Sequence, residues 1–163
     1  MRNILVAALL ALALPMAAQA KSFKIGDDTP FATVAVPDSW DPEEIDHGVS
    51  GNSEAGTYVQ VEAVALKDIE ATITENLKYL AGEGVSISDS SLKKGEARID
   101  GVDLIIREWH GTDKDGDAVV TIAIAVLDPE RTVVMTTWSS PDAEKTDGAE
   151  IESIAGSIKA VAK

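Results

Sequence analysis

Hydrophobic and polar residues alternate along several short stretches of this chain, and a period of two residues indicates half-buried β-strands. The alternation is clearest at residues 57–66, where valines and alanines fall on one face and Tyr58, Gln60 and Glu62 on the other. A shorter apolar stretch at 31–36 ends at a proline. Further strands are expected at 85–87, 97–99, 102–110, 118–127 and 132–139, with Asp100-Gly101 as a hairpin turn and other turns at 113–117 and 128–131.

A helix is expected between the strand at 57–66 and the later run of hairpins. Isoleucine and leucine recur every three or four residues from Ile69 to Leu80, which places them on one stripe of a helix. Asp68 is suited to cap the start of this helix, and Gly82 and Gly84 are suited to end it.

A second amphipathic helix is expected at the end of the chain. Asp147, followed by Glu150 three residues later, resembles a capping box and predicts where this helix begins. Ser140-Pro141 is suited to capping a separate turn before it. The apolar stripe of the helix is formed by Ile151, Ile154, Ile158 and Val161.

The strand at 118–127 differs between its two faces. The residues at 120, 122, 124 and 126 are large and share one face, and those at 121, 123 and 125 are small and share the other. Both faces are apolar, so both are expected to be covered, and the small face lets a helix approach closely. The last helix is the candidate for that position. The chain therefore predicts an α+β fold, a twisted, mainly antiparallel sheet packed by two amphipathic helices.

The first twenty residues have a different pattern. Arg2 gives a positive start, residues 4–14 form an apolar run, and Ala18-Gln19-Ala20 is a small-x-small cleavage site. The apolar run is shorter than the about 20 residues that a membrane-spanning helix needs. We predict a signal peptide over 1–20, cleaved after Ala20. One α+β domain over 21–163 would then reside in the periplasm or outside the cell.

Composition narrows the functions that this domain can have. There is no cysteine, which excludes disulfides and thiol chemistry. Removal of the leader takes away Arg2 and leaves 13 basic residues against 28 acidic ones, a net charge of −15. Such a charge repels nucleic-acid phosphates and anionic lipids, so no nucleic-acid partner is expected. No second apolar stretch is long enough to span a membrane.

The order of these elements resembles a known family. A short strand ends in Pro37-Asp38-Ser39-Trp40, and an irregular acidic segment leads to a long alternating strand, a helix, hairpins and a terminal helix. This order is similar to the PsbP-like α/β sandwich, a fold found in many small exported proteins of the DcrB type. The resemblance covers about residues 23–161. It implies an accessory or protein-binding role and carries over no catalytic or cofactor-binding residue.

Three aspartates in one turn are the sharpest local motif. Asp113, Asp115 and Asp117 occupy alternate positions and could direct oxygens toward a calcium ion. The later positions of a calcium loop do not match, because Ala118 and Ile124 stand where glycine and glutamate are needed. A polar hairpin turn accounts for the same residues. We expect no obligatory cofactor, with weak Ca²⁺ binding as the alternative.

The two histidines are the candidates for acid–base chemistry. His47 ends an acidic segment at 41–47, which is interpreted as a solvated loop. Alternation places His110 on the same strand face as Glu108, which could form an acid–base pair in a small hydrolase. A satisfied polar pair at the edge of a sheet is the favoured interpretation.

Tryptophans are the candidates for an interaction surface. Trp40 and Trp138 are two of only seven aromatic residues, and either could contact a partner if exposed, although burial in the core is the commoner position. The hypothesis that follows is a non-enzymatic accessory or protein-binding module of the bacterial cell envelope, with an envelope protein as partner. A protein that binds a small ligand or a divalent cation through acidic loops is the alternative.

Overall fold

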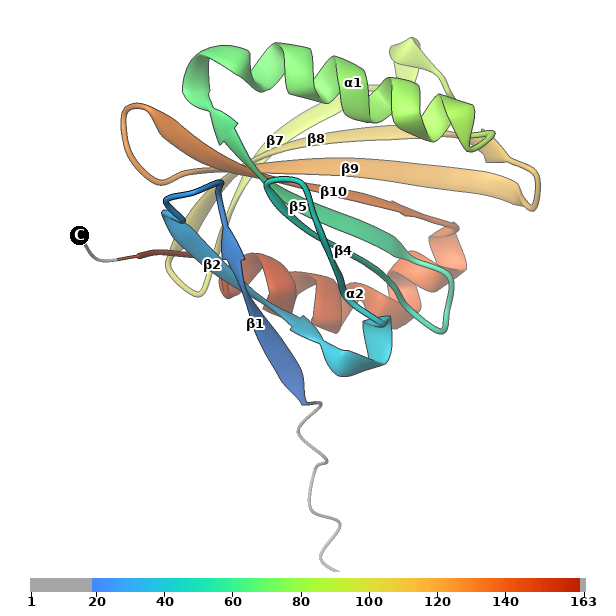
Figure 1. Cartoon of the computed structure of the whole chain (residues 1–163). Coiled ribbons are helices and arrows are strands. Elements are labelled where there is room, and N and C mark those ends of the chain that lie inside the picture. Colours follow the sequence, from blue (N-terminus) through green and yellow to red (C-terminus); the bar gives the residue numbers. More distant parts are fainter. Residues whose placement is uncertain (1–18, 162–163) are drawn as a thin grey trace, which may run out of the picture.

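The computed structural model describes residues 19–161 and has a three-layer arrangement (Figure 1). Helix α1 (Ile69–Gly82) covers one face of a large sheet, while α2 (Pro141–Gly156) and a small sheet lie against the other face. Within residues 19–161, neither helix is long and apolar enough to cross a membrane.

The large sheet is antiparallel throughout and contains eight strands in the order β3-β4-β5-β10-β9-β8-β6, with β7 also paired to β8. Their bounds are β3 Glu43–Ile45, β4 Gly48–Asn52, β5 Tyr58–Ala65, β6 Ser86–Ile87, β7 Lys93–Ile99, β8 Val102–Asp113, β9 Gly116–Val126 and β10 Arg131–Ser139. The small sheet has the order β1-β2-β11, from Ala20–Ile25, Ala32–Pro37 and Lys159–Ala160. Short 3₁₀ turns lie at Asp38–Trp40, Leu66–Asp68 and Asp89–Ser91.

The predicted difference between the two faces of β9 is confirmed. Ala123 and Ala125 belong to the core cluster that contains Ile154 of α2 and the small sheet. Ile122 belongs to the opposite cluster, together with Leu80 of α1. A twisted antiparallel sheet between two helices is thus the observed fold class.

The hairpin turn between β7 and β8 is also as predicted. Asp100 and Gly101 both have positive φ, at 49° and 89°, as a two-residue hairpin turn requires. The turn sets the register that pairs Ile99 with Val102 and continues along β8 to Lys93 opposite Glu108.

The start of α2 differs from the prediction. The helix begins at Pro141, and the Ser140 hydroxyl caps it by accepting a hydrogen bond from the amide of Ala143 at 3.2 Å. Asp147 is therefore a buried residue within the helix, where it accepts a hydrogen bond from the Ser53 hydroxyl at 2.5 Å. A proline at the first helical position favours this earlier start. The predicted stripe is also interrupted, because the helix ends at Gly156.

Asp68 does occupy the N-cap position of α1, but its side chain makes no capping hydrogen bond. A 3₁₀ turn immediately precedes the helix, so the backbone is already in a helical turn where α1 begins. At the other end, Gly84 has a φ of 93° and reverses the chain after α1, as its predicted role required.

Four short strands were not predicted, although Phe23 and Ile25 alternate with polar residues in the first of them. They are β1, β3, β4 and β11, of which β3 falls in the acidic segment interpreted as a loop. In β4, Gly48 lies so close to β5 that a Cβ there would be 1.9 Å from the carbonyl oxygen of Val61. Lys21, the predicted first residue after cleavage, is the second residue of β1. Residues 1–18 of the predicted signal peptide lie outside the described residues.

Candidate functional site: a groove beside helix α1

Trp40 lies in the core rather than on the surface. It sits in the 3₁₀ turn after β2 with 1% of its area exposed, and its indole Nε1 donates a hydrogen bond to Glu150 Oε2 of α2 at 2.5 Å. Trp40 therefore has the commoner of the two positions expected for it, burial in the core, in a cluster with residues of the small sheet and α2.

Trp138 is half-buried on the α1 side of β10, where it packs against the apolar cluster under α1. Its Nε1 donates to Asp113 Oδ2 at 3.0 Å. The structure thus brings together two residues that were predicted for different roles, an interaction surface and a metal site.

The three candidate metal ligands lie along the β8–β9 hairpin. Asp113 Oδ1 accepts hydrogen bonds from the amides of Asp115, at 2.8 Å, and Gly116, at 3.1 Å, while Asp117 is paired with Thr112 in the ladder. Both carboxylate oxygens of Asp113 are therefore used by the turn and by Trp138. Among residues 19–161, no group of three or more His, Cys, Asp or Glu side chains is placed to hold a metal ion.

Glu108 and His110 do share one face of β8, as predicted. His110 Nε2 lies 2.8 Å from Glu108 Oε1, and the Lys93 ammonium lies 3.0 Å from both groups. The hydrogen bond from Lys93 holds the pKa of the Glu108 carboxyl below its usual range. The nearby Ser91 hydroxyl bonds to the main chain of His110 and not to its ring. The arrangement is an open, solvated ion-pair cluster.

His47 is separate from that cluster. It lies in the turn between β3 and β4 with a φ of 68°, and its exposed ring contacts the carboxylate of Asp27. Its carbonyl accepts the amides of Gly26 and Ala63, so its main chain joins the small sheet to β5.

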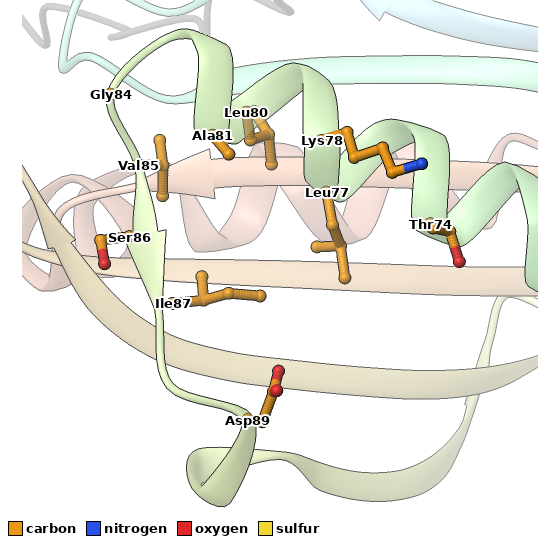
Figure 2. Close-up of a pocket in the computed structure, with 10 residues that line it drawn as sticks. All are labelled: Thr74, Leu77, Lys78, Leu80, Ala81, Gly84, Val85, Ser86, Ile87 and Asp89. Carbon is orange, nitrogen blue, oxygen red and sulfur yellow. The ribbon is translucent and has the colours of Figure 1, made fainter.

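An open groove lies between α1 and the segment that follows it (Figure 2). It has a volume of about 600 Å³, within the range of ligand sites. It is lined from α1 by Thr74, Leu77, Lys78, Leu80 and Ala81, and from the following segment by Gly84, Val85, Ser86, Ile87 and Asp89.

Local sequence explains why the groove forms. The amide of Val85 donates to the carbonyl of Leu80 at 3.0 Å, which ends α1. Gly84 then turns the chain away from the helix, and Ser86 and Ile87 pair with Thr112 and Gly111 of β8. The helix and the edge of the sheet consequently diverge from Gly84, and the groove lies between them.

The interior of the groove is apolar and its rims are charged. Leu77 and Ile87 are half-buried and point into the space between the helix and β6 (Figure 2). Lys78 and Asp89 are exposed on opposite walls. The Thr74 hydroxyl donates to the carbonyl of Glu70 at 2.8 Å. An apolar interior with charged groups at its rims is typical of a binding surface.

The opposite flank of α1 is closed by a polar network. Asn76 donates to Glu62 Oε1 at 2.6 Å and to the Thr136 hydroxyl at 3.1 Å, and Gln60 donates to the same Glu62 oxygen at 3.0 Å. Burial between helix and sheet raises the pKa of the Glu62 carboxyl, and burial likewise raises that of the Tyr58 phenol. The network fixes α1 on the β5 side and leaves its β6 side open.

The groove was not predicted from the sequence. Leu77 was assigned to the buried stripe of the helix and Ile87 to a weak strand, and both assignments describe them correctly. Their common cavity depends on the angle between α1 and the edge of the sheet, for which a single sequence has no signal.

Solved structures share this fold. The solution structure of cyanobacterial PsbP (CyanoP) from Synechocystis sp. PCC 6803 superposes with a TM-score of 0.58 at 9% identity, covering 96% of this chain and 99% of that one. LpqN of Mycobacterium tuberculosis, described as involved in cell envelope biogenesis, gives 0.53 at 13% identity and covers 88% and 92%. A Bacteroides thetaiotaomicron protein gives 0.57 at 13% identity over 89% of this chain and half of its own length.

These similarities establish a PsbP-like fold, which confirms the resemblance drawn from the order of elements. No family model matches the sequence, and no curated protein matches it. At such low identity the shared architecture carries no function with it.

Proposed function

We propose that this protein is an exported, non-enzymatic accessory module of the cell envelope that binds a partner protein through the groove beside α1. The observation that supports the proposal is the apolar groove interior formed by Leu77 and Ile87, which is open to solvent. The description of LpqN as an envelope-biogenesis protein of the same fold is consistent with it.

Crosslinking in intact cells tests the proposal, with affinity purification of a C-terminally tagged protein. The tag is placed there because the leader is expected to be removed. We expect reproducible envelope partners with the wild-type protein and their loss with Leu77→Lys. Ile105→Lys is the matched control, because Ile105 is an apolar residue of β8 with 45% of its area exposed, outside the groove lining. Equal recovery of partners by Leu77→Lys and wild type would contradict the proposal.

Export is tested separately by cell fractionation and N-terminal sequencing. We expect the protein in the periplasmic or extracellular fraction with Lys21 as its first residue. A cytoplasmic protein that retains Met1 would refute this part of the proposal.

A further inference from the structure

Strand β6 lies at an open edge of the large sheet, and its main chain borders the groove. It is the last strand in the sheet order, paired on one side only, through Ser86 with Thr112 and Ile87 with Gly111 of β8. The next residue, Ser88, donates its amide to the carbonyl of His110 at 3.1 Å. Peptide groups that point toward a neighbour alternate with those that point away, so the N–H and C=O of Ile87 are directed away from β8.

The two residues of β6 contribute differently to the lining of the groove. The Ser86 and Ile87 side chains point in different directions (Figure 2), yet both residues border the groove. One wall of the groove is thus β6, where Ile87 directs its N–H and C=O away from β8, and the other is the side of α1 that carries Leu77 and Lys78.

We propose that the groove binds an extended segment of the partner protein, which adds to β6 as a further strand of the sheet. A groove between a helix and an open strand edge suits this mode, because the main chain supplies hydrogen bonds and the helix supplies pockets for alternate side chains. The segment would place an apolar side chain between Leu77 and Ile87. This inference rests on the proposed function and names the form in which the partner binds.

Charge complementarity narrows the chemistry of the segment. Lys78 and Asp89 lie on opposite walls and are exposed, so an acidic side chain on one flank of the apolar residue and a basic one on the other would each meet its opposite. The protein as a whole is strongly acidic, with a net charge of −14 over the full chain. A segment with this pattern is favoured at the groove over a uniformly acidic one.

The test uses short blocked peptides as probes on the isotope-labelled mature protein. One peptide alternates valine and threonine, with glutamate before and lysine after its central valine. A second has the two charges exchanged, and a third has aspartate in place of the central valine. We expect one of the first two to bind and the third not to bind. Binding should slow hydrogen exchange of the Ile87 amide, which would become hydrogen-bonded.

Two variants separate main-chain from side-chain contributions. Ile87→Pro removes the outward N–H and is tolerated at a strand edge, and it should weaken peptide binding about tenfold or more relative to Ile87→Val, which keeps that N–H. Lys78→Glu should reverse the preference between the two charged peptides, and the same change at Lys145 of α2 should not. Circular dichroism and thermal unfolding verify that each variant is folded.

Three results would overturn the inference. Equal peptide affinity of Ile87→Pro and Ile87→Val would mean that no strand is added. Binding of decanoate in the groove without binding of any peptide would mean that the ligand is an acyl chain. Failure of all peptides, while cellular partners still depend on Leu77, would reject strand addition but leave the proposed function standing. Partners that do not depend on Leu77 would reject the proposed function itself.

Discussion

Replacement of Trp40 tests whether this residue belongs to the core or to a binding surface. The indole is 1% exposed and is held by its hydrogen bond to Glu150 of α2, so its removal should cost stability before it costs any interaction. A buried tryptophan withdraws about 200 Å² from water, which at about 25 cal/mol/Å² is worth about 5 kcal/mol. Tryptophan-to-alanine changes in cores cost about 3–5 kcal/mol, and we expect Trp40→Ala to lie in that range.

Trp40→Phe separates the two contributions. Phenylalanine keeps most of the buried ring area but cannot donate to Glu150. A hydrogen bond to a charged group is worth about 1.5–3 kcal/mol. Glu150 is half-buried and can be hydrated in the variant, so we expect the lower end, about 1.5 kcal/mol.

Urea unfolding followed by circular dichroism measures both effects, since the other tryptophans complicate a fluorescence signal. At a typical m-value of about 2 kcal/mol/M, a loss of about 4 kcal/mol lowers the midpoint by about 2 M. Trp138→Phe is the control, because Trp138 is half-buried and donates to Asp113 on the rim of a turn, and it should cost about 1 kcal/mol. An unchanged midpoint for Trp40→Ala would refute the burial of this side chain.

Further predictions concern helix capping, pH and metal ions. Ser140→Ala should cost about 1 kcal/mol in urea unfolding, whereas Asp68→Ala should cost a few tenths, because only Ser140 of these two N-cap residues makes a capping hydrogen bond. Burial raises the pKa of Glu62, so its contribution to stability is fully present below its unfolded pKa and is lost as the pH rises through its folded pKa. Glu62→Gln should therefore raise Tm at pH 7 relative to wild type, and the difference should shrink on acidification; a constant difference would contradict this. Because the carboxylate of Asp113 is occupied by hydrogen bonds, Tm should be the same in EDTA and in millimolar calcium, and a clear rise with calcium would reinstate the cation site.

Several features of the fold were predictable because their signals are local. Hairpin turns depend on residues that tolerate positive φ, and Asp100-Gly101 has them side by side. The assignment of each face of β9 depends on side-chain size at alternate positions, and this size pattern is visible in the sequence. The polar pair of Glu108 and His110 likewise follows from alternation alone.

The candidate site was not predictable in the same way. The groove depends on where α1 diverges from the edge of the sheet, and its open character depends on β6 having a strand on one side only. Neither property belongs to any single stretch of sequence. The hypothesis of a binding module was reached from the resemblance and the missing catalytic motifs, while the surface assigned to it comes from the structure.

The sequence by itself determined the strand and helix periods, the strong negative charge and the absence of cysteine, because each of these is a property of neighbouring residues or of composition. The tertiary structure decided that Trp40 is buried, since its hydrogen-bond partner lies 110 residues away in the chain. It also decided where α2 begins, with Ser140 and not Asp147 as the cap. The formation of the small sheet, in which Lys159 pairs with Thr33, likewise depends on the tertiary structure. These outcomes depend on contacts between distant segments, whose free energy is gained only when the whole domain has closed around them.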